Sequence, residues 1–293
     1  MRCIASLDKD IISRKIENSE IIIPRKLGRY EVDEKIASGG FGIVVRAHSI
    51  SSGKNVAIKI EMKNLKYPQL KVESQFQAYL SEELGDRIPY IYGLYETKRF
   101  KYNVMELFDI TVLKYLEMNS IPLYTTLYVG IQILETLRLM HNLFVVHRDI
   151  KPANFMLSFD RRRLVLIDFG FCKKYYDVDE GHIENVTRLM MYTKRYVSVW
   201  VEAGQQSSRR DDLISLGYSL ISMHSRSLPW DSGISKKEYI TRVSFPDCPS
   251  CLNQWIEYLY TLDFESTPDY EYLSALLSRR MNTCQKKEII WEK

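Results

Sequence analysis

The sequence predicts an α+β protein with a small β-rich amino-terminal part and a larger, mainly helical carboxy-terminal part. Short runs rich in β-branched and aromatic residues dominate as far as Phe108, and long segments with apolar residues at helical spacing follow. The 293 residues, 45% hydrophobic and 27% charged, can bury a sizeable core as one two-lobed domain or two small ones. This composition excludes a disordered or low-complexity chain.

The amino-terminal part is predicted to be a small sheet with one helix. The β-rich runs lie at 30–36, 43–48, 55–61, 91–96 and 103–107. The helix follows Pro68, carries apolar residues at helical spacing and ends at Gly85, a residue suited to a carboxy-terminal cap. Residues 1–29 mix charge with isoleucine without a firm period, so we expect an extension there.

The carboxy-terminal part is predicted to be mainly helical. Its helical patterns lie at 123–142, 211–225, 251–262 and 269–281. Between the first two are short runs at 145–147, 155–157 and 164–167, which flank the densest set of polar residues. We therefore expect a domain at 30–281, divided into lobes at 30–108 and 109–281, with a short segment at 282–293 and a ligand cleft between the lobes.

Charge and cysteine content limit the expected partners and cellular compartment. The balance of 41 basic and 37 acidic residues gives only +4, so we expect no nucleic-acid partner. Five cysteines at irregular spacing favour a reducing compartment, and the CxxC of Cys248 and Cys251 lacks the second ligand pair that zinc needs. Neither a secretory signal nor an apolar run of membrane-spanning length is present, so we expect a location in the cytoplasm or nucleus. We also expect a monomer.

Residues 36–44 form a glycine-containing turn between two predicted strands. Bare backbone at Gly39, Gly40 and Gly42 can approach phosphates and direct amide groups at them, although such a turn alone is more often a simple hairpin. The next strand delivers Lys59, 17 residues after Gly42. The amphipathic helix offers Glu73 as a partner for this lysine, since a buried charge needs one.

The densest motif is HRDIKPAN at 147–154, followed 14 residues later by Asp168-Phe169-Gly170. This spacing matches the catalytic and metal-binding motifs of protein kinases. In phosphoryl transfer, Asp149 would orient the substrate hydroxyl and Lys151 would steady the γ-phosphate. Asn154 and Asp168 would hold two magnesium ions through hard oxygen ligands.

One segment before this motif and four after it narrow the resemblance. They read YPQL at 67–70, TKRYVSVW at 193–200, SRRDDLISLGY at 208–218, SLPW at 227–230 and PDYEYL at 268–273. Together they resemble the casein kinase 1 family of serine/threonine protein kinases, from about residue 30 to 281. The resemblance implies a bilobal protein-kinase-like fold, use of ATP and Mg²⁺, and acidic or already phosphorylated protein substrates. It also implies that activation-loop phosphorylation is not required.

The resemblance also assigns residues to nucleotide binding. Lys59, tethered by Glu73, would bind the α- and β-phosphates, Met105 would lie behind the adenine, and Glu106 to Phe108 would form the hinge. Val44 and Ala57 would cover the ring, and Asp212 would brace the catalytic loop. The residues expected to cover ATP are Ile36, Ala37, Ser38, Gly39, Gly40, Phe41, Gly42, Ile43 and Val44.

Several positions depart from the family pattern. Ala37 replaces the first glycine of the loop, and Tyr192 and Trp200 make the expected substrate shelf bulkier. Arg195 matches an arginine that binds a substrate phosphate in the family. The usual lysine partner of that arginine aligns with Glu238, which leaves Lys236 or Lys237 as the second cation.

Two alternatives remain beside an active casein kinase 1-type enzyme. One is a pseudokinase or scaffold that keeps the fold without turnover, as Ala37, Tyr192 and Trp200 suggest. Against it stands the complete set of catalytic polar residues: Lys59, Glu73, Asp149, Lys151, Asn154 and Asp168. The usual A-P-E sequence that closes a kinase activation segment is absent here, and an active kinase of the vaccinia-related group would share this altered activation segment. The double aspartate at 211–212 and the intact HRD sequence favour the casein kinase 1-type enzyme.

Overall fold

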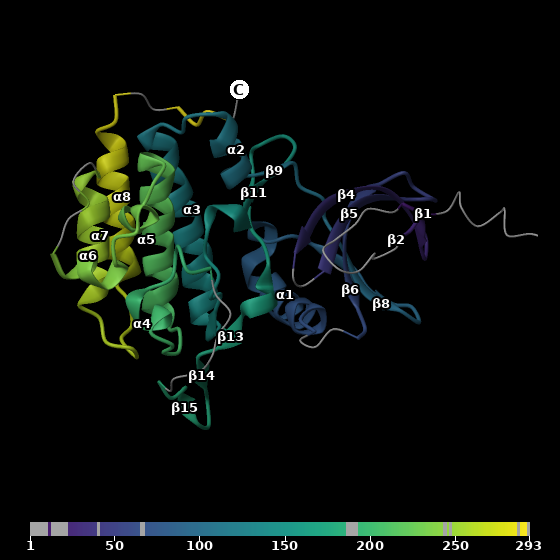
Figure 1. Ribbon diagram of the computed structural model, residues 1–293, viewed down its shortest axis with the longest axis horizontal. Helices are drawn as coiled ribbons and strands as arrows, with labels where there is room; N and C mark the ends of the chain where they lie inside the picture. Colours follow the sequence, from purple (N-terminus) through teal and green to yellow (C-terminus); the bar gives the residue numbers. More distant parts are fainter. Residues whose placement is uncertain are drawn as a thin grey trace, which may run out of the picture. The chain divides into compact units, whose positions relative to one another are not determined.

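The computed structural model describes residues 11–12, 23–39, 42–64, 68–185, 193–242, 245, 248–285 and 288–291. The chain divides into two compact units (Figure 1), one within Met1–Ser74 and Pro89–Leu107, the other within Gln75–Ile88 and Phe108–Lys293. The first unit holds an antiparallel sheet and the second is mainly helical. The predicted α+β class is confirmed. No helix in the described ranges is long and apolar enough to cross a bilayer.

The first unit contains a six-stranded sheet in the order β3-β4-β5-β6-β8-β7. Its strands are β3 (Lys26–Leu27), β4 (Tyr30–Gly39), β5 (Gly42–Ser49), β6 (Asn55–Met62), β7 (Ile91–Glu96) and β8 (Phe100–Met105). A separate short pair joins β1 (Ile11–Ile12) to β2 (Ile23–Pro24). The five predicted strands are all present.

Two strand positions differ from the prediction. Strand β8 begins at Phe100 instead of 103, because Phe100, Tyr102 and Val104 alternate onto the buried face of the sheet. The sheet also extends upstream of Tyr30, where fully buried Leu27 lies in β3 and pairs with β4. The sequence pattern predicted only an extension in that region.

Helix α1 (Leu70–Leu84) follows Pro68 and ends before Gly85, as predicted. Gly85 has φ +52°, a left-handed conformation that glycine adopts at helix ends without steric cost. A short 3-10 helix, η1 (Gly85–Arg87), follows.

The second unit is built on long helices with shorter ones around them. The helices are α2 (Val112–Met118), α3 (Leu123–Asn142), α4 (Val199–Glu202), α5 (Arg209–Ser225), α6 (Lys236–Arg242), α7 (Ser250–Tyr260) and α8 (Tyr270–Asn282). Helix α3 packs against α5 and α8 (Figure 1). The four predicted helices are present; α2, α4 and α6 were missed because four to seven residues carry too little periodicity.

Short strands and turns between α3 and α4 position the polar loops. They are β10 (Val145–Val146), β11 (Phe155–Leu157), β12 (Leu164–Leu166), β13 (Lys173–Lys174), β14 (Tyr176–Asp177) and β15 (Gly181–His182). Strand β11 pairs with both β12 and β9 (Ile110–Thr111). Antiparallel pairing of β11 with β12 brings the chain after β12 back beside the loop that precedes β11.

Candidate active site

The glycine-containing turn joins β4 to β5 in the first unit. The paired residues at its base are Ala37 with Val44, Ser38 with Ile43, and Gly39 with Gly42. Predicted residues Gly40 and Phe41 lie outside the described ranges. Gly42 has φ +132°, and a Cβ atom there would lie 2.3 Å from the Ile60 carbonyl oxygen, so the position requires glycine. Ala37 pairs with Val44 directly after a register shift between Lys35 and Ala37, so its methyl group does not interrupt the hairpin.

Lys59 on β6 and Glu73 in the first turn of α1 form an ion pair within the first unit. The Lys59 Nζ atom donates to Glu73 Oε2 at 2.6 Å, and the two side chains are 16% and 4% exposed. The structure therefore brings together these two predicted residues. In such a sheltered pair each charge stabilises its partner, and removing either one leaves an uncompensated buried charge.

A second contact, which sequence reasoning missed, fixes α1 against the same strand. Glu61 lies two residues after Lys59 on β6, is buried, and accepts hydrogen bonds on Oε2 from the amides of Gln69 (2.6 Å) and Leu70 (2.9 Å). A carboxylate at a helix amino terminus satisfies unpaired amides and the positive end of the helix dipole. Strand β6 thus holds the start of α1 at two points.

The predicted adenine-binding residues lie on three neighbouring strands. Ala57 on β6 pairs with Met105 at the end of β8, and Val44 on β5 pairs with Lys59. The Glu106 amide then donates to the Tyr90 carbonyl at 2.8 Å. The first unit ends at Leu107 and the second resumes at Phe108, so the predicted hinge is the segment where the chain passes between the units.

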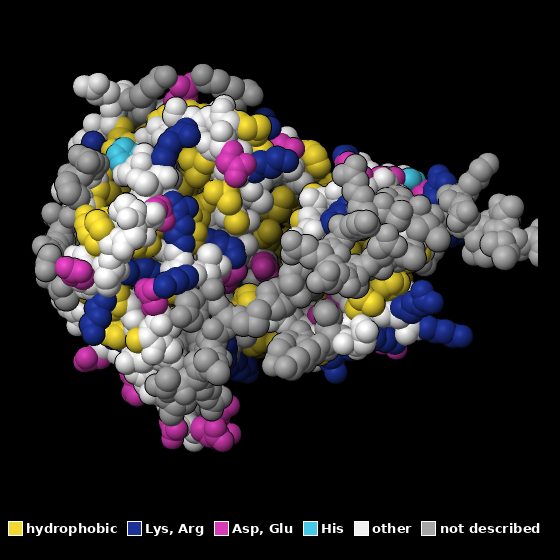
Figure 2. Space-filling view, in the orientation of Figure 1, with side chains coloured by type: hydrophobic (Ala, Val, Ile, Leu, Met, Phe, Trp, Pro, Cys, Tyr) yellow, Lys and Arg dark blue, Asp and Glu magenta, His cyan; other side chains and the backbone are white. Residues whose placement is uncertain are grey.

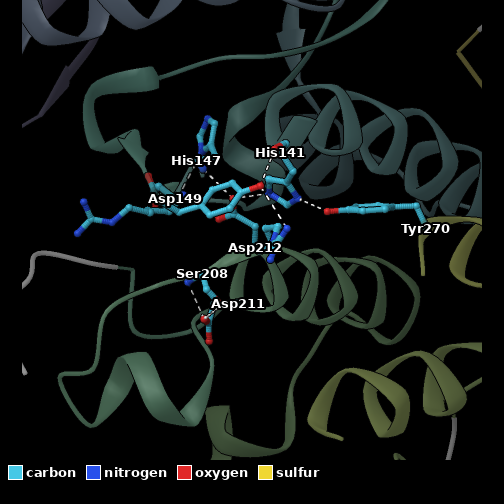
Figure 3. A network of polar contacts seen from close by, with 10 residues as sticks. His141, His147, Asp149, Ser208, Asp211, Asp212 and Tyr270 are labelled. Carbon is cyan, nitrogen blue, oxygen red and sulfur yellow. Dashed lines mark hydrogen bonds and ion pairs between the residues drawn. The ribbon is translucent and has the colours of Figure 1, made fainter. Parts of the chain in front are cut away.

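In the second unit, the loop at 147–154 is held by a buried carboxylate of α5 (Figure 3). Asp212 accepts from the backbone amides of His147 (2.7 Å) and Arg148 (2.8 Å), and His141 Nε2 lies 3.2 Å from it. Burial opposes ionisation of Asp212, but these hydrogen bonds and the nearby histidines outweigh burial and hold its pKa below the usual range. His141 in turn contacts the Tyr270 hydroxyl at 2.7 Å.

Within this loop, Asp149 is surrounded by donors. Its Oδ2 atom accepts from Lys151 Nζ (2.6 Å) and Asn154 Nδ2 (3.1 Å), and its Oδ1 accepts from the Thr193 hydroxyl (2.7 Å). Lys151 also donates to Thr193 Oγ1 at 2.9 Å. Two predicted residues, Lys151 and Asn154, converge on the carboxylate of a third, Asp149. Thr193 is an additional contact that was expected only as part of a family motif.

Asp168 follows β12 and is joined to the same loop through the backbone. The Ile167 amide donates to the Asn154 carbonyl at 2.9 Å, so the residues before Asp168 lie against the turn that carries Asn154. Asp168 has φ 68°, ψ 74°, a left-handed conformation that is uncommon outside glycine. The following Phe169 is buried, and its ring packs edge-on against His147.

The segment that carries Thr193 is anchored to α5 by a second buried aspartate. Asp211 accepts from the Ser198 hydroxyl and from the Ser208 amide at 2.8 Å, and burial raises the pKa of its carboxyl group (Figure 3). Nearby, the Arg210 guanidinium lies 3.6 Å from the centre of the Trp200 ring. These contacts fix the residues that follow Arg195.

A comparison with protein-family models finds that the protein kinase domain matches residues 30–279. The chain belongs to the protein kinase domain family. The match spans both units and includes the glycine-containing turn, Lys59, the loop at 147–154 and Asp168. Membership implies that the kinase domain uses ATP and acts on protein substrates.

The three residues predicted to bind a substrate phosphate line one pocket of the kinase domain, with a volume of about 670 Å³. Arg195 is paired with Asp231, and Lys237 is exposed. Lys236 is only 4% exposed, and its Nζ atom donates to the carbonyls of Lys194 (2.7 Å) and Val197 (2.8 Å). The ammonium group of Lys236 therefore holds the backbone around Arg195.

Proposed function

We propose that this chain is an active serine/threonine protein kinase of casein kinase 1 type, which transfers the γ-phosphate of ATP to hydroxyl groups in acidic or phosphorylated proteins. The convergence of Lys151, Asn154 and Thr193 on Asp149 supports the proposal most strongly. Phosphoryl transfer depends mainly on positioning and electrostatic stabilisation, and a carboxylate fixed by three donors is a preorganised acceptor for a substrate hydroxyl.

In this mechanism Asp149 orients the hydroxyl and takes its proton as the bond to phosphorus forms. Lys151, hydrogen-bonded to the same carboxylate, stabilises negative charge on the transferred group. Lys59 binds the α- and β-phosphates, and Glu73 holds its ammonium in place. The backbone of the turn at 36–44 covers the phosphates.

The residues assigned to magnesium fit that ion. The Asn154 Nδ2 atom donates to the Asp149 carbonyl at 2.8 Å, which orients the amide and leaves Oδ1 as its oxygen donor. Asp168 adds a carboxylate, and oxygen ligands of this kind suit Mg²⁺, which usually takes only one or two protein ligands. Bound Mg²⁺ would neutralise charge on the phosphates.

The casein kinase 1 assignment rests on the segments at 193–200, 208–218 and 227–230. In the structure these segments contact one another: the Asp211 carboxylate accepts from the Ser198 hydroxyl, and the Trp230 Nε1 atom donates to the Arg195 carbonyl at 2.8 Å.

The irregular cysteine spacing supports a location in a reducing compartment, either the cytoplasm or the nucleus.

Labelled γ-phosphate transfer from MgATP to casein tests this function. Acid hydrolysis of the product should yield phosphoserine and phosphothreonine, and Lys59→Met and Asp168→Ala should lose incorporation while remaining folded by circular dichroism. Phosphotyrosine as the main product would overturn the serine/threonine assignment. A folded wild type that is stabilised by ATP but transfers no phosphate would support the pseudokinase alternative.

A further inference from the structure

The pocket that contains Arg195 is also lined by Lys194, the residue that follows Thr193 in the chain. Thr193, whose hydroxyl contacts Asp149, is two residues before Arg195. The basic side chains that line the pocket are Lys194, Arg195, Lys236 and Lys237, and the acidic ones are Glu202 and Asp231. Figure 2 shows side chains of both signs interspersed over the α4 and α6 region of this unit. A protein segment that presents its hydroxyl to Asp149 would therefore pass close to these charges.

Most of the cations in the pocket already have partners. Lys194 and Lys236 both lie 3.4 Å from Glu202, one at each carboxylate oxygen. Lys237 is exposed and forms no ion pair within the described part of the chain. The charge left for an external group depends mainly on Arg195 and Lys237.

Arg195 is held by Asp231 in a forked contact. Its Nε atom lies 2.9 Å from Asp231 Oδ1, and its Nη2 atom lies 2.7 Å from Oδ2. Two parallel hydrogen bonds of this kind are also how a guanidinium binds a phosphate or a free carboxylate, so one fork cannot serve both partners fully. The two side chains are 34% and 33% exposed, so an external anion can reach them.

Further hydrogen bonds hold both partners of the Arg195–Asp231 pair in place. Asp231 Oδ2 accepts from the Leu228 amide at 2.8 Å and so caps the 3-10 helix η4 (Pro229–Ser232). The preceding Trp230 binds the Arg195 carbonyl through Nε1. The Arg195 hydrogen bonds raise the ionised fraction of Asp231 despite its partial burial, so its pKa lies below the usual range and it is a full negative charge at neutral pH.

We propose that Asp231 is an internal competitor for Arg195 and sets how strongly this kinase prefers substrates with an acidic or phosphorylated residue near the target. Phosphoserine carries about two negative charges against one on Asp231, so it can displace the carboxylate, but only after the internal pair has been broken. The preference for phosphorylated substrates is therefore weaker than an unpaired Arg195 would give. This inference rests on the proposed protein kinase function.

Asp231→Asn tests the proposal with little change in shape. The asparagine Oδ1 atom can still accept the Leu228 amide, while the negative charge is lost. The substrates are peptides with phosphoserine, aspartate or serine at successive positions on either side of the target serine. We expect Asp231→Asn to raise the ratio of kcat/KM for the phosphoserine peptide over the serine peptide by about fivefold, the size that a partly exposed ion pair contributes. The aspartate peptide shows whether loss of the Asp231 charge improves kcat/KM for a carboxylate-containing substrate as much as for a phosphorylated one.

Two further variants make the result specific. Asp179→Asn removes the same charge at the β14–β15 hairpin, where acidic side chains gather in Figure 2, and should leave the ratio unchanged. Arg195→Ala together with Asp231→Asn should abolish the gain. An unchanged ratio in Asp231→Asn, or a gain that survives without Arg195, would overturn the proposal.

A direct binding measurement separates this proposal from the proposed function. Fluorescence anisotropy of a labelled phosphopeptide with alanine at the target position requires no turnover. Tighter peptide binding by Asp231→Asn would support the proposal that Asp231 competes for Arg195, even in a preparation that transfers no phosphate. A lack of phosphate transfer would count only against the proposed kinase function. Equal binding by wild type and Asp231→Asn would overturn the proposal that Asp231 competes for Arg195.

Discussion

His147 must be neutral to make its two hydrogen bonds. Its Nε2 atom lies 3.2 Å from the Ile167 carbonyl oxygen and must donate, and its Nδ1 atom accepts from the Asp149 amide at 3.3 Å. An imidazolium would present a hydrogen at both nitrogens and lose the second bond. Burial lowers the pKa of His147, although Asp212, Asp149 and Asp168 oppose this.

This environment predicts acid destabilisation through His147. Because the folded state lowers its pKa, the unfolded chain binds more protons below its usual value of 6.5. The contribution to stability is complete above about pH 6.5 and is lost as the pH falls below it, with a slope of at most about 1.4 kcal/mol per pH unit for one proton.

Urea unfolding of wild type and His147→Phe between pH 5 and pH 8 measures this effect. The variant should be less stable throughout but should lose less stability on acidification. Equal slopes for the two proteins in this range would contradict the assignment. His224, whose pKa burial also lowers, contributes the same background slope to both proteins.

Helix α1 depends on strand β6 for its position. Glu61 caps its first amides, and Lys59 binds Glu73 one turn later. These two contacts place Glu73 beside the strand that carries its lysine, so the ion pair depends on the cap as well as on its own charges.

Glu61→Ala should therefore lower both stability and activity. Loss of a helix cap costs about 1–2 kcal/mol, and displacement of Glu73 should reduce kcat/KM for phosphate transfer. Hydrogen exchange of the α1 amides should accelerate at its first turn. Glu61→Gln keeps a carbonyl acceptor and should recover much of the loss. Glu83 is exposed at the other end of α1, so Glu83→Ala is the matched control. If Glu83→Ala lowered stability and activity as much as Glu61→Ala, capping by Glu61 would not be the cause of the loss.

The periodic elements and the Lys59–Glu73 pair could be predicted from sequence, whereas the other contacts that position the site could not. Apolar spacing and Gly85 were enough to predict α1, and the motif spacing was enough to select Asp149 and Asp168. The cap by Glu61 was missed because a glutamate in a strand has the same sequence signal whether it faces solvent or a helix end. Asp231 was missed because its partner Arg195 is 36 residues away in the sequence, and no local pattern connects the two.

Across the whole molecule, two separate clusters of buried side chains support the two units. The cluster of the helical unit includes residues beyond the family match, which ends at 279. Trp291 is 3% exposed and packs edge-on against Tyr115, while the Thr125 hydroxyl donates to the Glu288 carbonyl at 3.0 Å. Residues 288–291 of the predicted carboxy-terminal segment therefore contribute to the core.

Trp291→Ala should destabilise the helical unit by about 3–5 kcal/mol, the usual cost of removing a buried aromatic side chain. Thermal unfolding followed by circular dichroism measures the change. Phe159→Ala removes a ring that is 56% exposed and should change the midpoint little. Equal midpoints for Trp291→Ala and wild type would show that this segment adds nothing to the core.

The most direct test of the central claim compares wild type and Asp149→Asn in one preparation, with ATP-dependent thermal stabilisation and labelled phosphate transfer to casein measured side by side. We predict that both proteins are stabilised by ATP and that transfer falls by about 10²–10⁴-fold in the variant, because asparagine cannot take the substrate proton. Undiminished transfer by a folded Asp149→Asn would contradict the account.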